Sequence, residues 1–274
     1  GAAHRRPHDR HGIRGMSSTS SSRPVALVTG ARRGIGLAIA EALAAAGYDI
    51  AMTGTRRDDE AEAALARVAA AGGRVAFSAF DLADLSSHEP ALAAIEAELG
   101  PVDVLVNNAG IGAVVRGDLL DLLPENFDTV IDVNLRGTLF LTQAVVKRML
   151  GRAPVHPRAV LTVSSVSAAL ASPERADYCI SKAGLAMFVQ NLALRLAGTD
   201  IGVYELRPGI IRTDMTAKVS EKYDRLIAGG LVPAGRWGEG ADIGRAAVAL
   251  ASGAFGFATG AVIDLDGGLA IPRL

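Results

Sequence analysis

From Pro24 onward, short apolar runs alternate with longer segments in which apolar residues recur at helical spacing. Near-continuous apolar strands separated by helices are typical of a parallel sheet that is covered on both faces. The pattern therefore predicts an α/β fold, a single-domain doubly wound (Rossmann) sheet of seven parallel strands with helices on both faces. The expected strands are 24–29, 48–53, 74–80, 102–108, 158–165, 201–208 and 261–265. The expected helices lie near 34–47, 58–71, 86–99, 125–150, 176–197 and 240–252.

No internal repeat or linker interrupts this pattern, and residues 24–274 are expected to form one Rossmann-fold domain. The first 23 residues differ, because they are rich in His, Arg and Ser and lack periodicity. We expect residues 1–23 to be a disordered tail. An expression leader, or upstream read-through with Met16 as the true start, is favoured over a native arm that binds nucleic acid.

Charge, cysteine content and hydropathy exclude several classes of partner. The whole chain has a net charge of −1 and residues 1–23 contribute +4, which leaves −5 for the rest. An acidic domain argues against DNA or RNA as the main partner. Cys179 is the single cysteine, and the sequence has no Cys/His cluster with metal spacing, no secretory segment and no membrane-length apolar run. We expect a cytoplasmic protein with no metal, nucleic-acid or membrane partner.

A glycine-rich loop, "VTGARRGIG", joins the first strand to the first helix and contains Gly30, Gly34 and Gly36. Glycines allow a sharp turn and let backbone N–H groups approach a pyrophosphate at the positive end of a helix. The spacing differs from the usual Gly-x-Gly-x-x-Gly, and such turns are sometimes purely structural. A P-loop is excluded because no Gly-Lys-[Ser/Thr] follows. The loop favours a dinucleotide site.

Two further motifs follow at the ends of later strands. "NNAG" (107–110) ends the fourth strand, where ligands bind in open α/β sheets. "SSVSAALASPERADYCISKAG" places Ser165 thirteen residues before Tyr178, and Lys182 four residues after it. Residues i and i+4 share one face of a helix, so Tyr178 and Lys182 are expected to lie together. An exposed pair without a catalytic role is the alternative.

With these motifs the chain resembles the short-chain dehydrogenase/reductase family over nearly all of Pro24–Leu274. "TGARRGIG" matches the family's TGxxxGIG, "YCISK" its YxxxK, and Asn134 in "DVNLRGT" its catalytic Asn. The "RPG" turn at 207–209 and the terminal "ATGAVIDLDGG" are also similar. Among family members, the chain resembles the 3-oxoacyl-carrier-protein reductases in particular. The resemblance implies interconversion of a ketone and a secondary alcohol with a nicotinamide cofactor.

The chemistry of that reaction suits these side chains. A ketone that becomes an alcohol receives a hydride on carbon and a proton on oxygen, and a phenol exchanges protons at neutral pH only if its anion is stabilised. We expect Tyr178 to be the acid/base, the Lys182 ammonium to stabilise its anion, and Ser165 to hydrogen-bond the substrate oxygen. Ser165 is not expected to be a nucleophile, because the matched regions contain no histidine. The resemblance adds Asn134, which completes a proton relay through water.

The resemblance also implies which residues hold the cofactor. The glycine loop would bind the pyrophosphate, Lys182 the ribose hydroxyls, and Ile211 and Thr213 the carboxamide. The full expected set is Gly30, Arg32, Arg33, Gly34, Ile35, Gly36, Thr55, Arg56, Asp81, Leu82, Asn108, Ala109, Gly110, Tyr178, Lys182, Pro208, Gly209, Ile211 and Thr213.

Cofactor choice depends on the end of the second strand, where NAD sites carry an acid that accepts from the ribose 2′-OH. The sequence there is Gly54-Thr55-Arg56-Arg57. Arg56 and Arg33 could clamp a 2′-phosphate, so NADP(H) is preferred and NAD(H) is possible. Two alternatives stay open: Arg32 and Arg57 are solvated surface charges, or Asp58 and Asp59 serve NAD because the strand ends later.

The sequence says less about the identity of the substrate than about the reaction and the cofactor. The segment 216–240 resembles a substrate lid, and a small ketone, alcohol or acyl thioester is expected. A sugar or polyol dehydrogenase that uses NAD and, remotely, a non-catalytic dinucleotide-binding regulator are the alternatives. Thr199 and Asp200 stand where carrier-protein reductases have a docking cation, and Arg152 and Arg158 are the possible substitutes. Lid residues that either line a pocket or pack it are Lys218, Tyr223, Leu226, Ile227, Leu231, Val232 and Trp237.

Assembly is suggested by excess apolar surface on the two long helices near 125–150 and 176–197. The resemblance implies a homotetramer built through these helices and the last strand. Burial within one subunit is the alternative. The residues concerned are Leu139, Phe140, Val145, Val146, Leu185, Phe188, Val189 and Leu192.

Overall fold

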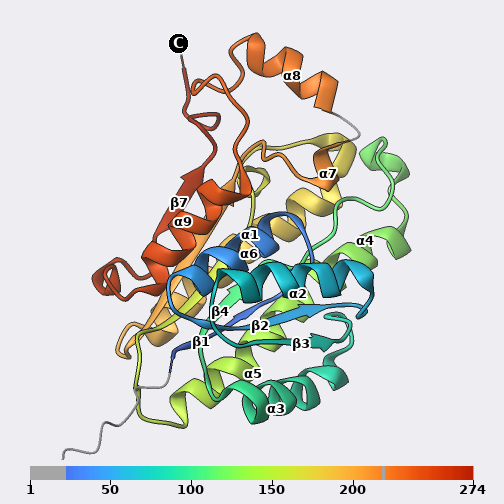
Figure 1. Ribbon diagram of the computed structural model, residues 1–274. Helices are drawn as coiled ribbons and strands as arrows, with labels where there is room; N and C mark the ends of the chain where they lie inside the picture. Colours follow the sequence, from blue (N-terminus) through green and yellow to red (C-terminus); the bar gives the residue numbers. More distant parts are fainter. Residues whose placement is uncertain (1–22, 218–219, 274) are drawn as a thin grey trace, which may run out of the picture.

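A computed structural model describes residues 23–217 and 220–273, and it confirms the predicted fold (Figure 1). Seven parallel strands form one sheet in the order β3-β2-β1-β4-β5-β6-β7. The strands are β1 (Val25–Val28), β2 (Asp49–Gly54), β3 (Val75–Ala79), β4 (Val102–Asn107), β5 (Arg158–Val163), β6 (Ile201–Pro208) and β7 (Val262–Leu265). The helices are α1 (Gly34–Ala45), α2 (Asp59–Ala71), α3 (His88–Leu99), α4 (Pro124–Ile131), α5 (Thr138–Leu150), α6 (Ala176–Leu196), α7 (Asp214–Ala217), α8 (Ser220–Ala228) and α9 (Gly240–Ala251).

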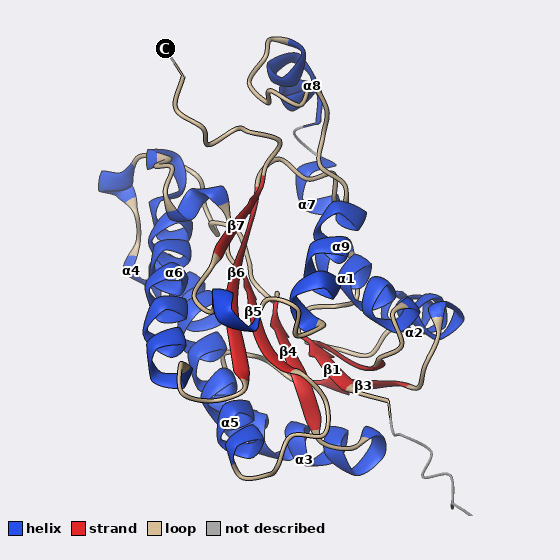
Figure 2. Cartoon of the chain, turned by 90° about the vertical axis from the view of Figure 1, so that its left-hand side faces the viewer, coloured by secondary structure: helices blue, strands red, loops and turns tan. Residues whose placement is uncertain are grey.

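Helices cover both faces of the sheet, with α1, α2 and α9 on one side and α3, α5 and α6 on the other (Figure 2). Successive side chains of β1 point to opposite faces, so that Ala26 and Val28 join one core and Val25 and Leu27 join the other. Each fully buried large aliphatic side chain contributes roughly 1.5–3 kcal/mol. This double burial explains why the strands are continuously apolar.

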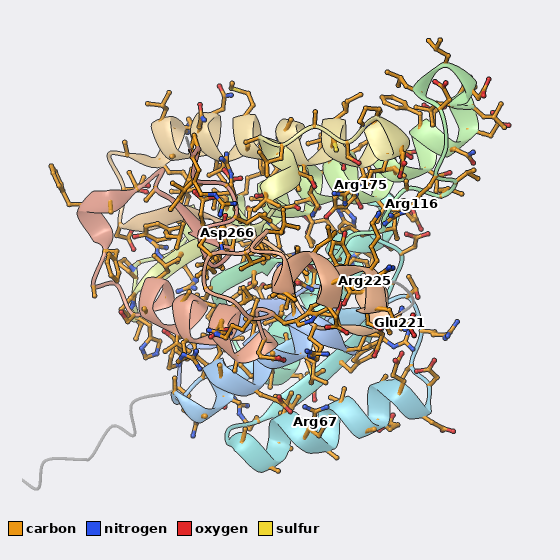
Figure 3. The ribbon with its side chains drawn as sticks, turned by 90° about the horizontal axis from the view of Figure 1, so that it is seen from above. Arg67, Arg116, Arg175, Glu221, Arg225 and Asp266 are labelled. Carbon is orange, nitrogen blue, oxygen red and sulfur yellow. The ribbon has the colours of Figure 1, made fainter. Side chains whose placement is uncertain are left out.

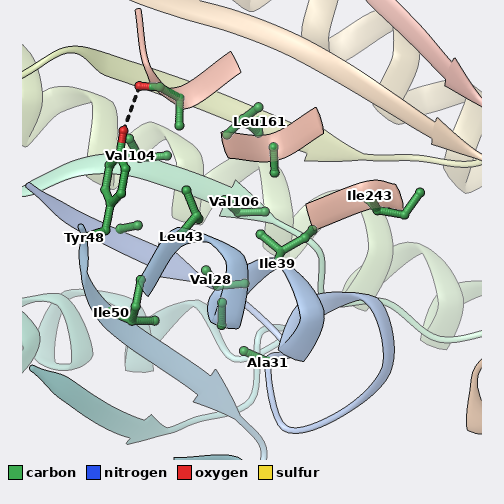
Figure 4. Close-up of a cluster of buried hydrophobic side chains, with 14 of the residues drawn as sticks. Val28, Ala31, Ile39, Leu43, Tyr48, Ile50, Val104, Val106, Leu161 and Ile243 are labelled. Carbon is green, nitrogen blue, oxygen red and sulfur yellow. Dashed lines mark hydrogen bonds between the residues drawn. The ribbon is translucent and has the colours of Figure 1, made fainter. Parts of the chain in front are cut away.

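The core under α1 and α9 also satisfies a buried polar group (Figure 4). Tyr48 packs among the apolar side chains, and its hydroxyl donates to the carbonyl of Ala251 at 3.0 Å. Burial raises the pKa of Tyr48 above its ordinary value, and the nearby Asp103 carboxylate adds to this effect. Tyr48 therefore remains neutral and ties the end of α9 to the start of β2.

The order of the strands reverses beside β1, which pairs with β2 on one side and β4 on the other. At such a switch point the connections leave in opposite directions and open a crevice outside the carboxyl ends of the strands. The glycine loop follows β1 and the NNAG motif follows β4, so both lie at this crevice.

The prediction of a single helix near 125–150 is wrong in one respect. A π-helical segment, Asp132–Gly137, separates α4 from α5. Gly137 at the end of this segment packs closely on the backbone of Leu82, since a Cβ there would lie 2.3 Å from the Leu82 carbonyl oxygen. A π-bulge widens the turn and redirects a side chain, here the buried Asn134.

The lid segment contains α8, and a small apolar cluster of Ile227, Val232 and Trp237 holds the segment together. The indole N–H of Trp237 donates to Asp224 at 2.7 Å, and Tyr223 contacts the indole ring edge-on. These side chains therefore pack the lid against itself. Residues 1–22 of the predicted tail, with Met16, and the lid residue Lys218 fall outside the described residues. Arg23, the last residue of the predicted tail, is described and pairs with Asp49 at 3.5 Å.

Two absences apply to the described part of the chain. None of its helices is long and apolar enough to cross a membrane. Within the same residues, no group of three or more His, Cys, Asp and Glu side chains is arranged to hold a metal ion.

Candidate active site

The glycine loop has the conformation and the free backbone donors that an anion site requires. Gly30 and Gly34 adopt φ values of +64° and +58°, which L side chains rarely adopt. The loop leads into α1, whose N-cap residue, Arg33, makes no side-chain capping hydrogen bond. The first turn of α1 also lacks an acidic residue. The N–H groups and the dipole of α1 are thus available to a pyrophosphate, and the residues fit a dinucleotide.

The NNAG motif locks the loop in place. Asn108 donates its side-chain amide to the carbonyls of Thr29 and Gly30, at 2.9 and 3.2 Å. The Thr29 hydroxyl accepts from the backbone of Asn108 and Ala109, both at 3.0 Å. A Cβ on Gly36 would lie 2.4 Å from the Asn108 amide nitrogen, so only glycine fits there. The side chain of Asn108, a member of the expected cofactor set, therefore holds the loop itself.

Asn134 and Lys182 meet beside the NNAG motif. The Asn134 amide pairs with both backbone groups of Ile111, at 2.8 and 2.9 Å, and donates to the Ser181 hydroxyl at 3.0 Å. Lys182 is buried and donates from Nζ to the carbonyl of Val163 at 3.2 Å. A Cβ built on Gly110 would lie 3.1 Å from Asn134 Oδ1 and 3.6 Å from Lys182 Nζ. Three motifs far apart in the sequence thus converge at one place.

Tyr178 and Ser165 complete the expected catalytic set. Lys182 Nζ lies 5.6 Å from the centre of the half-buried Tyr178 ring. Ser165 is buried, and its Oγ accepts from the backbone N–H of Ser167 at 3.1 Å. Among the described residues, neither hydroxyl has a protein acceptor. Both therefore remain able to bind a substrate oxygen.

Three arginines and two carboxylates meet where the adenosine of the cofactor is expected. This cluster, here called the adenosine rim, consists of Arg32, Arg33, Arg56, Asp58 and Glu60. Arg32 packs over Gly54 at the end of β2 and binds Asp58 and Glu60, at 2.7 and 2.6 Å. Its side chain is only 13% exposed, so the interpretation of Arg32 as a solvated surface charge is wrong. Arg33 and Arg56 are 65% and 72% exposed and contact Glu60 and Asp58 respectively.

Two neighbours at this rim play simpler roles. Arg57 is 55% exposed and pairs with Glu62, which is the behaviour of a surface charge. Asp58 caps α2 by accepting from the N–H of Ala61 at 3.1 Å. The Arg56 guanidinium that donates to Asp58 holds the pKa of this carboxyl below its ordinary value, so it stays ionised at neutral pH.

The remaining expected cofactor residues surround the same crevice. Thr213, which precedes α7, approaches Gly34, since a Cβ on Gly34 would lie 3.6 Å from its methyl group. Gly209 follows Pro208 and packs so tightly on Asp266 that a Cβ would lie 2.7 Å from the Asp266 Cβ. Ile211 is buried and forms a bridge with Gly238.

Two further residues of the expected cofactor set already have protein partners. Asp81 accepts from Ala83 N–H at 2.9 Å, and buried Leu82 contacts Gly137. Ile35 lies half-buried in the loop, and Thr55 is exposed.

Sequence reasoning missed three residues near Tyr178. Ser181 donates to the carbonyl of Tyr178 at 2.7 Å and so joins Asn134 to the catalytic helix. Asp177 is buried and accepts from the Tyr178 N–H at 2.7 Å. Arg175 places its guanidinium 5.4 Å from the centre of the Tyr178 ring. Their positions within a few residues of YxxxK were a usable signal.

Comparisons with known proteins agree with this geometry. A sequence model described as short chain dehydrogenase matches residues 24–224. The 3-oxoacyl-[acyl-carrier-protein] reductase FabG of Escherichia coli K12 is 37% identical over 246 residues, 89% of this chain and 96% of that protein. The 2-dehydro-3-deoxy-D-gluconate 5-dehydrogenase of Formosa agariphila is 33% identical over 248 residues, 89% of this chain and 92% of that protein.

A solved structure is more similar still. The 3-oxoacyl-[acyl-carrier protein] reductase from Brucella melitensis, in complex with NAD, has 59% sequence identity and a TM-score of 0.90. The match covers 93% of this chain and all of the Brucella chain.

Proposed function

The chain belongs to the short chain dehydrogenase family, and on this premise we propose that it interconverts a ketone and a secondary alcohol with NADP(H), with Tyr178 as acid/base. Oxidoreductases of this family act on CH–OH and C=O groups and bind NAD(P)(H). The observation that carries the proposal is the convergence of Asn134, Tyr178 and Lys182 at the carboxyl ends of β4 and β5. Turnover of a nicotinamide cofactor on a ketone panel tests it.

Each side chain has a distinct part in the reaction. When bound, a reduced nicotinamide supplies the hydride. Ser165 and Tyr178 donate hydrogen bonds to the ketone oxygen, and Tyr178 transfers its proton to that oxygen as negative charge develops there. The buried Lys182 ammonium stabilises the resulting phenolate. Asn134 fixes Ser181 and Ile111 and thereby orients the wall of the site.

Charge at the adenosine rim supports NADP(H). Arg32, Arg33 and Arg56 contribute three positive charges against two negative ones from Asp58 and Glu60. A 2′-phosphate would add the missing anion, and guanidinium groups bind phosphate with strong, charge-assisted hydrogen bonds.

Arg56→Ala should weaken NADPH binding roughly 10- to 100-fold and leave NADH binding almost unchanged, because only NADPH carries the phosphate that this guanidinium would hold. Fluorescence titration of both reduced cofactors measures the two affinities. Arg57→Ala is the matched control, since Arg57 is adjacent in sequence but pairs with Glu62. Higher salt should weaken NADPH more than NADH.

NAD(H) is the second candidate, because the ionised Asp58 lies among these arginines and the similar Brucella reductase was solved with NAD. A carboxylate here would accept from a free 2′-OH. Equal affinities of the unmutated protein for NADPH and NADH, with no loss in Arg56→Ala, would favour that candidate.

A 3-oxoacyl-thioester-like ketone is the proposed substrate type, with weak use of carrier-linked substrates. The two possible substitute docking cations already bind inside the subunit. Arg152 binds Asp103 at 2.7 Å, and Arg158 is buried and bound to Asp200, with its Nε 2.6 Å from a carboxylate oxygen. The hydrogen bond from Arg158 holds the pKa of Asp200 below its ordinary value, so this pair persists at neutral pH.

Acetoacetyl attached to carrier protein and to coenzyme A should therefore give kcat/KM values within about tenfold of each other, because rim charges that speed docking are missing. Steady-state kinetics at low and high salt provide the comparison. A carrier preference of about a hundredfold that disappears in high salt would show that a docking surface exists elsewhere.

A homotetramer is proposed for the assembly, although among the expected residues Phe140 is the one with an exposed side chain, and Leu139, Phe188 and Leu192 are only half-buried. Val145, Val146, Leu185 and Val189 are buried within the subunit. The outer face of α6 instead exposes Ile180, Met187 and Leu194, which recur every seven residues and form one stripe. Light scattering at micromolar concentration should give four times the chain mass, whereas the mass of a single chain would refute the assembly.

A dehydrogenase of a small secondary alcohol such as a sugar acid is the second candidate function. The name of the relative from Formosa specifies a sugar-acid substrate. That relative matches this chain over 248 residues, and the Escherichia coli reductase matches it over 246. The cytoplasmic location stays a prediction.

A further inference from the structure

Arg175 lies next to the proton donor, Arg116 belongs to a loop beside Arg175, and both are outside the catalytic set. Arg175 immediately precedes α6, and its guanidinium carbon lies 5.4 Å from the centre of the Tyr178 ring. Arg116 belongs to a neighbouring loop, which is joined to the Arg175 segment by a hydrogen bond from Gly117 N–H to the Glu174 carbonyl at 3.2 Å. Figure 3 shows both side chains at the same end of the molecule.

Neither arginine is neutralised by an acidic partner among the described residues, in contrast with the arginines of the adenosine rim. Arg32, Arg33 and Arg56 all contact carboxylates, but no ion pair within the described ranges includes Arg116 or Arg175. Arg175 is nevertheless half-buried, held against an aromatic ring. A partly desolvated guanidinium with unused donors attracts an anion strongly, and its planar fork fits a carboxylate.

We propose that Arg175, assisted by Arg116, binds a carboxylate carried by the substrate, so that the substrate is a short oxo acid and the product the matching hydroxy acid. This inference rests on the proposed reaction, the interconversion of a ketone and a secondary alcohol with Tyr178 as acid/base. It replaces the thioester-like ketone with a short oxo acid as the preferred substrate. The guanidinium contacts the Tyr178 ring, and the hydroxyl that protonates the ketone belongs to the same ring. The proposal requires that one small molecule contact both this hydroxyl and Arg175.

The anion could be a carboxylate of an oxo acid or a phosphate of a pantetheine thioester, and the two differ in their distance from the ketone. In an oxo acid the carboxylate lies a few bonds from the ketone, at about 1.5 Å per bond. In a pantetheine thioester the nearest phosphate lies more than about ten bonds away, roughly 15 Å along an extended arm by the same bond length. A guanidinium in contact with the Tyr178 ring fits the first arrangement.

The test compares acids with neutral analogues of the same skeleton: acetoacetate with methyl acetoacetate, and 5-keto-D-gluconate with L-sorbose. In the unmutated protein, kcat/KM for at least one acid should exceed that for its neutral partner by tenfold or more. Arg175→Met should lower this acid-to-neutral ratio at least tenfold, mainly through KM of the acid. Arg175→Lys should restore part of it, and Arg116→Ala should lower it less.

Two further arms complete the design. Arg195→Met is the control, since Arg195 is exposed in the last turn of the same helix and far along it from Tyr178. The kcat/KM for acetoacetyl-coenzyme A should not depend comparably on Arg175. If Arg175→Met lowered it as much as it lowers kcat/KM for acetoacetate, the arginines would instead bind a phosphate of coenzyme A. Calorimetry then gives the affinity of Tyr178→Phe for acetoacetate, and that of the double variant Tyr178→Phe/Arg175→Met. Both proteins lack the proton donor, so binding of the acid is measured without turnover.

The outcomes separate this inference from the proposed function. If neutral ketones are reduced as well as the acids and Arg175→Met leaves the ratio unchanged, the inference is overturned while the function stands. If no ketone is reduced, the proposed function fails. The calorimetric comparison then decides the inference alone, since unchanged acetoacetate binding after removal of Arg175 would contradict it.

Discussion

Tyr178→Phe should lower kcat by a factor on the order of 10³ or more, because it removes the only assigned proton donor while the ring keeps its packing. Arg175 and Lys182 both lie over that ring, at 5.4 and 5.6 Å from its centre, and these contacts do not need the hydroxyl. Cofactor affinity should barely change. Single-turnover oxidation of bound NADPH with a ketone measures the loss directly.

Tyr223→Phe is a matched control for this substitution, since Tyr223 packs on the lid side chain Trp237 away from the catalytic set. It should retain most of the activity. More than about a tenth of the unmutated rate in Tyr178→Phe would remove the tyrosine from the mechanism, because general acid–base catalysis contributes typically 10²–10⁴-fold.

Lys182→Met should damage both turnover and cofactor binding, because one ammonium is assigned two tasks. We expect kcat to fall by roughly 10²–10⁴-fold through loss of phenolate stabilisation, with a weaker NADPH complex as the second effect. Methionine keeps an unbranched apolar stem in the buried site, so the helix should still pack. Stopped-flow turnover and equilibrium titration of NADPH give the two quantities separately.

Lys147→Met provides the comparison, since Lys147 is exposed on α5, where its ammonium donates to Gln143 at 3.3 Å. A Lys182→Met protein that loses turnover but binds NADPH normally would contradict the ribose role. Loss of both in a protein with unchanged circular dichroism would support the two tasks together.

The strands were predictable because a parallel sheet buried on both faces imposes an apolar residue at nearly every position. Val25–Val28, for example, is apolar and buried throughout, and the sequence pattern needs no other information to indicate it. The structure confirms all seven strands within about two residues, which is the usual uncertainty of element ends.

The π-helical segment was not predictable in the same way. Asp132–Gly137 keeps the apolar spacing of a continuous helix, and its contacts are with Leu82 and Ile111, which lie far away in sequence. The spacing of apolar residues along a segment carries no information about contacts with distant parts of the chain. The resemblance singled out Asn134, but not the reason for its position.

Charges were the least predictable part of the site. Arg32 and Arg57 look alike in sequence, yet one is packed over Gly54 between two carboxylates and the other is a surface charge. Likewise Arg158, a possible docking cation by its place in the chain, is buried against Asp200. The partner of a long charged side chain is decided by tertiary folding, and sequence spacing indicates it only within one helix.

The central claim is that this chain transfers a hydride between a nicotinamide and a carbonyl carbon with Tyr178 as the acid/base. The most direct measurement follows the absorbance of the reduced nicotinamide with a panel of ketones and oxo acids, NADPH and NADH in parallel, and Tyr178→Phe alongside. Ketone-dependent oxidation of NADPH, faster than that of NADH and reduced on the order of 10³-fold in the variant, is the predicted result. Cofactor binding without oxidation on any member of the panel would contradict the account and favour a non-catalytic dinucleotide-binding protein.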